Sequence, residues 1–155
     1  MRDVGIMNLS ASLEDYLETI YLIVQEKQVA RAKDVSQRMQ VGRSSVTGAL
    51  HALAERKLIN YAPYDLVTLT RQGELVAADI VRRHCVLRDF FVKVLSVEET
   101  LADDVACKME HAVPESVLQR FVEFIEFVDR CPHDGAEWTR CLSQNWPTPR
   151  SHSSM

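Results

Sequence analysis

Three side chains that commonly bind metal ions fall within one short stretch of the sequence. Cys107, Glu110 and His111 form a Cys-x-x-Glu-His motif. Residues spaced i, i+3 and i+4 share one face of an α-helix, so a thiol, a carboxylate and an imidazole would converge within one turn. Residues 105–109 contain no glycine or proline, which predicts that a helix continues through the motif. These donors suit Zn²⁺, Fe²⁺ or Co²⁺, and also Mn²⁺ when more oxygen ligands join them.

The same motif also fits a purely structural role. Cys107 could be a small apolar core residue, with Glu110 and His111 solvated on the flank of a helix. Short motifs carry a real false-positive risk. The interpretation therefore depends on the rest of the chain.

The bulk composition is that of an ordinary globular protein. The chain has 155 residues, of which 46% are hydrophobic and 26% charged. No apolar run approaches the ~20 residues that cross a bilayer, and the first eight residues lack the features of a secretory signal. We therefore expect a cytoplasmic protein whose four cysteines serve as packing residues, ligands or sensors.

The net charge of −4 is distributed unevenly along the chain. Residues 30–83 contain nine Lys or Arg and five Asp or Glu, whereas the segments on both sides are acidic. A basic segment between acidic ends indicates a polyanion-binding surface, although a modest positive excess is also common on solvated surface.

The basic segment has the pattern of a helix-turn-helix. We expect Ser12 to cap a first helix with apolar residues at helical spacing. A second, amphipathic helix ends at Met39, and residues 40–43 separate it from a third helix over 44–56. Two short helices joined by a tight turn containing a glycine are typical of a helix-turn-helix, but also of an ordinary αα-hairpin.

Small polar groups gather where the third helix begins. Ser44, Ser45 and Thr47 can approach phosphates and base edges. Arg43 and the nearby Lys33 are expected to contact DNA phosphates.

A predicted β-hairpin follows these helices. The β-prone runs 58–61 and 66–70 flank an Ala-Pro-Tyr-Asp turn. Thr70 is expected to cap a long helix that reaches about Leu95. The order helix-turn-helix, hairpin, capped helix is a winged-helix layout, so DNA binding is favoured over the αα-hairpin.

The C-terminal half is predicted to be helical. Ser96–Glu99 should start the helix with the Cys-x-x-Glu-His motif, and Pro114 should open another. That last helix carries a wide apolar face, made of Val117, Leu118, Phe121, Val122, Phe124, Ile125 and Val128. Such a face indicates a homodimer interface, with a plain core helix as the alternative.

These features together resemble the metal-dependent transcriptional repressors of the diphtheria toxin repressor and manganese transport regulator family. The resemblance covers about residues 10–135. It is carried by five motifs: Leu-Glu-Asp-Tyr-Leu-Glu-Thr-Ile-Tyr over 13–21, Ser-Ser-Val-Thr over 44–47, Leu69-Thr70-x-x-Gly73, Arg83-His84, and Cys107-x-x-Glu110-His111.

The resemblance implies a mainly α fold with two domains. A winged helix-turn-helix DNA-binding domain is expected over 1–73 and a helical metal-binding and dimerisation domain over 74–135. Residues 136–155, rich in proline and serine, are expected to form a flexible tail. The chain ends too early for the SH3-like domain of the iron-responsive branch, so the shorter architecture of the manganese branch is expected.

The resemblance also implies a set of metal ligands. Those of the primary site are Asp15, Cys107, Glu110 and His111. Glu18 and His84 correspond to second-metal ligands of the manganese branch, with Glu110 placed to bridge the two ions.

The implied ligand set mixes two branches of the family. Asp15 is the residue of the manganese branch where the iron branch has methionine. Cys107 is the residue of the iron branch where the manganese branch has glutamate. Arg88 stands where the iron branch has an acid of its ancillary site. The implied function is repression of metal uptake by a homodimer that binds operator DNA when loaded with a divalent metal, first of all Mn²⁺, and otherwise Fe²⁺ or Zn²⁺.

Two other functions remain open at this stage. Cys-x-x-Glu-His is similar to the His-x-x-Glu-His motif of some zinc hydrolases, but Asp15 and Glu18 would fill the position that catalysis needs open. A winged-helix thiol sensor could use Cys107, or Cys85 with its arginine-rich surroundings. In the tail, Cys131, His133 and Cys141 are a weak candidate for a further zinc site.

Overall fold

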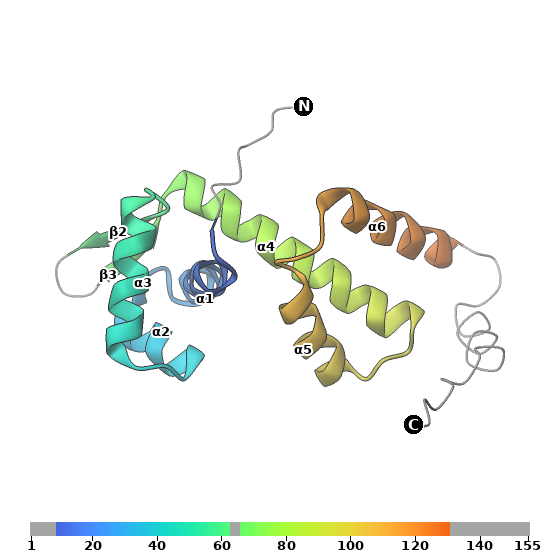
Figure 1. Cartoon of the computed structure of the whole chain (residues 1–155), viewed down its shortest axis with the longest axis horizontal. Helices are drawn as coiled ribbons and strands as arrows, with labels where there is room; N and C mark the ends of the chain where they lie inside the picture. The colour runs from blue at the N-terminus through green and yellow to red at the C-terminus, as the bar shows by residue number, and fades with distance from the viewer. Residues whose placement is uncertain (1–8, 63–65, 131–155) are drawn as a thin grey trace, which may run out of the picture. The chain divides into compact units, whose positions relative to one another are not determined.

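The computed structural model describes residues 9–62 and 66–130. The chain forms two compact units, Met1–Arg82 and Arg83–Met155, so the boundary falls inside a helix. The elements, shown in Figure 1, are α1 (Ala11–Lys27), β1 (Ala30–Arg31), α2 (Ala32–Met39), α3 (Arg43–Glu55), β2 (Ile59–Ala62), β3 (Leu66–Leu69), α4 (Arg71–Asp89), the π-helical turn η2 (Phe90–Val94), α5 (Glu99–Met109) and α6 (Glu115–Arg130). The mainly α fold is confirmed. Across the described ranges, no helix is long and apolar enough to cross a membrane.

The core of the first unit is built on α1. Leu17 and Ile20 lie one turn apart and are fully buried, as are Leu50 and Leu53 of α3. Burial of one such aliphatic side chain contributes roughly 1.5–3 kcal/mol. These residues belong to one continuous apolar cluster that also includes Val67 of β3.

The start of α1 differs from the prediction. Ser10, not Ser12, is the N-cap: its backbone is extended, and its hydroxyl oxygen accepts the Leu13 N–H at 3.4 Å. Leu9 is buried in the core just before it. The helix therefore begins two residues after Leu9, where packing fixes the incoming chain, and Ser12 lies inside the first turn.

The predicted helix-turn-helix is present as α2, a three-residue turn and α3. The turn is closed by Ser36, whose hydroxyl donates to the Val41 carbonyl oxygen at 2.7 Å. Its left-handed residue is Gln40 (φ 56°), whereas Gly42 has an ordinary φ of −67° and caps α3. The glycine is thus present as predicted, but the turn does not depend on its conformational freedom.

The predicted hairpin is formed by β2 and β3, which pair antiparallel with Ile59 opposite Leu69 and Ala62 opposite Leu66. The expected turn at residues 63–65 lies outside the described residues. Strand β1 pairs with the other edge of β3 and gives the sheet order β1-β3-β2. Sequence patterns did not reveal β1, because two residues are too few for alternation to be recognised.

The junction between the hairpin and α4 follows the predicted cap. The Thr70 hydroxyl oxygen accepts the Gly73 N–H at 3.0 Å, and the same hydroxyl lies 2.7 Å from the Lys57 carbonyl oxygen, to which it donates. A Cβ on Gly73 would lie 1.8 Å from the Leu58 carbonyl oxygen. A glycine is therefore required where α4 packs on the segment between α3 and β2.

The second unit differs from the prediction where α4 ends. A helix was expected to reach Leu95, but α4 stops at Asp89 and the chain continues as the π-helical turn η2. Leu95 donates its N–H to the Phe90 carbonyl oxygen at 3.3 Å, and Ser96 then takes a left-handed φ of 54°. The wider turn places Phe90 against Phe121 of α6, with ring centroids 4.6 Å apart.

A small apolar cluster holds the second unit together. Leu87 of α4, Ala106 of α5 and Leu118 of α6 are fully buried and belong to one apolar cluster. Figure 1 shows α5 and α6 next to the C-terminal part of α4, which agrees with this cluster.

We expect Gly73→Ala to destabilise the first unit by several kcal/mol, because backbone must move to admit the methyl group. Urea denaturation followed by circular dichroism measures the effect. Gly48→Ala is a matched control: Gly48 lies inside α3, and a Cβ added there would have nothing within 4 Å. The control should stabilise α3 by up to about 1 kcal/mol. Equal stability of the Gly73 variant and the wild type would contradict the proposed packing.

Candidate metal centre and DNA-binding surface

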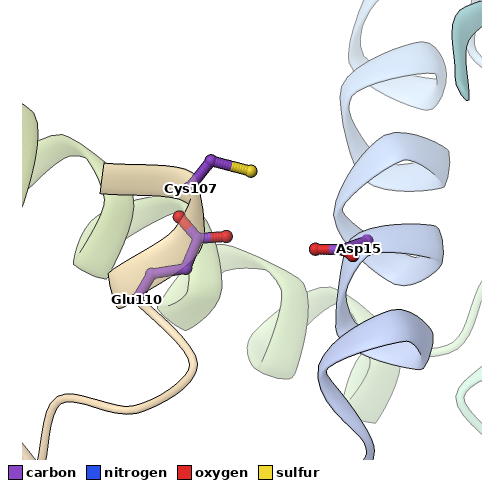
Figure 2. A group of neighbouring side chains, drawn as sticks. All are labelled: Asp15, Cys107 and Glu110. Atoms are coloured by element: carbon purple, nitrogen blue, oxygen red, sulfur yellow. The ribbon is translucent and has the colours of Figure 1, made fainter. Parts of the chain in front are cut away.

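The second unit brings together three of the expected metal ligands. The Sγ atom of Cys107 and a carboxylate oxygen of Glu110 lie within 4.8 Å of each other, and so do a ring nitrogen of His84 and a carboxylate oxygen of Glu110. Figure 2 shows Cys107 and Glu110 projecting from the end of α5, and Asp15 projecting from α1. The i, i+3 relation expected for Cys107 and Glu110 is therefore confirmed within this unit.

His111 reaches the site from a different element than expected. The helix α5 ends at Met109; Glu110 still has helical dihedral angles, and its N–H bonds the Ala106 carbonyl oxygen at 2.9 Å. His111 lies in the turn that follows. The prediction of a helix through the whole motif is wrong, because Pro114 and the turn before it end the helical bonding pattern. The His111 Nε2 atom nevertheless lies 3.5 Å from Glu110 Oε1.

Glu110 is the least expected feature of the site, because it is a fully buried carboxylate. Its Oε2 atom lies 2.7 Å from His84 Nδ1. Its Oε1 atom accepts no hydrogen bond within the described part of the chain. A buried oxygen left this way costs free energy unless a cation compensates it. The buried oxygen, the imidazoles and the thiol fit a divalent transition metal.

His84 carries the charge that balances Glu110 when no metal is bound. The hydrogen bond to Glu110 and, to a smaller extent, the one to Asp103 raise the pKa of His84 to about 9, against the opposing effect of burial. Nε2 of His84 lies 2.9 Å from Asp103 Oδ1. Sequence reasoning missed Asp103, although its position four residues before Cys107 puts it on the same side of α5.

The remaining expected ligands lie in the first unit. Asp15 and Glu18 are on α1, both partly exposed, and their i, i+3 spacing places them on one side of that helix.

The expected DNA-contacting residues form the exposed start of α3. Arg43, Ser44, Ser45 and Thr47 are exposed, and Lys33 is exposed on α2. Among the described residues, neither Lys33 nor Arg43 takes part in an ion pair. Their charges are thus available to an external anion.

Two local contacts shape this surface. Val46, fully buried, anchors the first turn of α3 in the core. The Thr47 hydroxyl donates to the Arg43 carbonyl oxygen at 2.9 Å, so this hydroxyl is left with acceptor capacity. Nearby, Arg38 pairs with Glu26 at 2.7 Å and Lys27 with Asp34 at 3.0 Å, which neutralises those bases.

In the metal-free protein we expect His84 to titrate with a midpoint near pH 9. Because this pKa lies above the ordinary value of 6.5, the stability gained from the protonated ring is fully present below about pH 6.5 and is lost as the pH rises through about 9. Histidine NMR resonances followed in chelator give the midpoint. Glu110→Gln should lower it clearly, and a wild-type midpoint near 6.5 would contradict the contact.

Comparisons with known proteins agree with these observations. Residues 8–67 match the family model described as iron dependent repressor, N-terminal DNA binding domain. Residues 70–139 match the model described as iron dependent repressor, metal binding and dimerisation domain.

Individual relatives lead to the same family. An uncharacterized HTH-type transcriptional regulator of Methanocaldococcus jannaschii is 34% identical over 119 residues, which are 76% of this chain and 95% of that protein. The HTH-type transcriptional regulator MntR of Shouchella clausii is 31% identical over 75% of this chain and 80% of its own length.

The fold of this chain is also similar to that of a solved structure. A manganese-dependent transcriptional repressor in complex with manganese superposes with a TM-score of 0.66 and 32% identity, over 78% of this chain. The chain spans 56% of that solved chain. With both family models matched in order, the chain belongs to the iron-dependent repressor family, the metal-dependent DNA-binding transcriptional regulators of the diphtheria toxin repressor and manganese transport regulator type.

Proposed function

We propose that this protein is a cytoplasmic homodimeric repressor that binds operator DNA when loaded with a divalent metal, and that it controls genes of metal uptake. The observation that carries the proposal is the buried Glu110 carboxylate, with one oxygen on His84 and the other without a hydrogen-bond donor among the described residues. The proposed domains are 1–73 for DNA binding and 74–135 for metal binding and dimerisation.

The proposed primary ligands are Asp15, Cys107, Glu110 and His111. Glu18 and His84 are proposed as ligands of a second metal, with Glu110 shared. This assignment rests on the family resemblance together with the close approach of Cys107 and His84 to Glu110. A bound ion would supply the positive charge that these carboxylates need.

Such a ligand set would couple metal binding to DNA binding. Asp15 and Glu18 belong to α1, whose other face forms the core against α3. Without metal, clustered carboxylates repel one another and disfavour the ligated arrangement. At metal one hundredfold above its Kd, the ligated conformer gains about 2.7 kcal/mol, which is enough to raise the DNA affinity about a hundredfold.

The donor types point to response to more than one metal. The thiolate of Cys107 favours Zn²⁺ and Fe²⁺, whereas the carboxylate of Asp15 favours Mn²⁺. We propose Mn²⁺ as the principal ion, in keeping with the manganese-bound relative, and Fe²⁺ or Zn²⁺ as further activators.

The proposed homodimer would use the apolar side of α6. Val117 and Phe127 are 44% and 56% exposed, while Leu118 and Val128 face the interior. Phe124 lies between Val117 and Phe127 in the sequence, and its ring centroid is 6.3 Å from that of Phe127. Large apolar groups exposed on one helix are typical of an interface that a partner covers.

The two alternative functions are less well supported. The matched relatives are transcriptional regulators, and we propose no catalytic role for the Cys-x-x-Glu-His residues. For thiol sensing, Cys85 and Cys107 are both exposed and reduced, but sensing by thiols alone leaves the buried Glu110 unexplained. The weak zinc candidate Cys131, His133 and Cys141 lies outside the described residues.

The first test is the metal dependence of DNA binding. In Mn²⁺, Glu110→Gln should lower the affinity for DNA fragments selected by the Mn²⁺-loaded wild type about a hundredfold, to the value in chelator. Fluorescence anisotropy measures the affinity, and circular dichroism verifies the fold. Asp104→Asn, which removes an exposed acid of α5, should leave the affinity unchanged. Equal wild-type affinity in chelator and in Mn²⁺ would refute the proposal.

The second test addresses the DNA-binding surface. Arg43→Ala should weaken binding to all sequences alike and reduce the dependence of log affinity on log salt by about one per subunit, because one phosphate contact is lost. Lys93→Ala removes the same charge from the second unit and should leave the slope unchanged. If Arg43→Ala keeps both affinity and slope, the assignment of α3 as the DNA-reading helix is wrong.

A further inference from the structure

His84 is held by a carboxylate at each of its two ring nitrogens. Nδ1 lies 2.7 Å from Oε2 of Glu110, and Nε2 lies 2.9 Å from Oδ1 of Asp103. The two carboxylates differ in environment, since Glu110 is fully buried and the Asp103 side chain is 59% exposed. The imidazole therefore connects an interior acid to a surface acid.

This arrangement matches the way in which proteins present histidine to metals. A ligating imidazole binds the ion through one nitrogen and usually donates the N–H of the other to a carboxylate or a carbonyl. Glu110 is the acid on the inner side, and its buried Oε1 lacks a hydrogen-bond donor among the described residues. Nδ1 is thus the nitrogen on the metal side, and Nε2 the nitrogen that keeps its proton.

We propose that Asp103 is a positioning residue of the metal centre, which accepts the Nε2–H of His84 and so fixes the tautomer whose Nδ1 lone pair is turned toward the metal. This inference rests on the proposed role of His84 and Glu110 as ligands. It adds a residue to the site that neither the motif nor the resemblance assigned.

Arg88 forms an ion pair with Asp103. It lies one turn after His84 on α4, with Nε 3.7 Å from Asp103 Oδ1 and Nη2 3.7 Å from Glu99 Oε2. A guanidinium stays charged at any physiological pH. Its positive charge attracts the Asp103 carboxylate and holds this acid on the outer side of His84, where it orients the ring.

The test uses Co²⁺ as the probe and needs no DNA. Asp103→Ala should weaken Co²⁺ binding, measured by the visible absorption of the bound ion, about 10- to 100-fold. Asp103→Asn keeps a neutral acceptor and should recover part of this loss. Asp104→Ala removes the neighbouring exposed acid and should change the affinity about twofold or less.

The second readout is the tautomer of His84 itself. With Zn²⁺ as a diamagnetic ion, ¹⁵N-labelled wild type should show the proton on Nε2 and the metal on Nδ1. In Asp103→Ala this pattern should be lost or broadened, whereas in Asp104→Ala it should persist. Loss of packing alone would not change which nitrogen carries the proton.

Two outcomes would overturn the inference. One is a metal bound to Nε2 of His84, and the other is an Asp103→Ala variant that binds Co²⁺ as tightly as Asp104→Ala. His84→Ala distinguishes a failure of the Asp103 role from a failure of the whole ligand set. If His84→Ala weakens Co²⁺ binding and Asp103→Ala does not, only the role of Asp103 fails. If His84→Ala leaves Co²⁺ affinity unchanged, the proposed ligand set fails with it.

Discussion

A carboxylate buried without a full set of partners governs the chemistry of the second unit. Glu110 has no exposed surface, and burying an ionised acid costs several kcal/mol unless charge or hydrogen bonds compensate it. Nδ1 of His84 lies 2.7 Å from one carboxylate oxygen, Oε2, and compensates its charge. The other oxygen, Oε1, lies 3.5 Å from Nε2 of His111. The fold thus keeps a carboxylate in its interior with an imidazole beside it, donor groups that fit the binding of a divalent cation.

The surrounding structure explains why this acid stays where it is. Glu110 caps α5, and its N–H is held by the Ala106 carbonyl, while Ala106 itself is packed against Leu87 and Leu118. The same small cluster therefore positions the acid and joins α4, α5 and α6. The change from α-helix to the π-helical turn η2 after Asp89 contributes to the same packing, because it directs the Phe90 ring onto Phe121 of α6.

The sequence predicted those features that depend on periodicity and on local capping. The Cys107–Glu110 spacing, the buried face of α3 and the Thr70 cap follow from helix geometry, and the structure contains each of them. The errors arise where packing over longer distances decides. Ser10 instead of Ser12 begins α1 because Leu9 is anchored in the core. Asp103 escaped notice because its partner is 19 residues away in sequence, a contact that no local pattern records.

In the proposed ligand set, a proton and a metal ion compete for Nδ1 of His84. The contact with Glu110 holds the pKa of His84 at about 9, so near neutral pH the ring of the metal-free protein carries a proton on Nδ1, the atom proposed to face the metal. A metal bound through this nitrogen would displace that proton, and its apparent affinity would then rise with pH up to about 9. The protonated ring also stabilises the metal-free fold, because it keeps the buried acid neutralised. In this way Glu110 can stay buried in both states, because a positive charge lies beside it in each, first the protonated His84 ring and then the divalent ion.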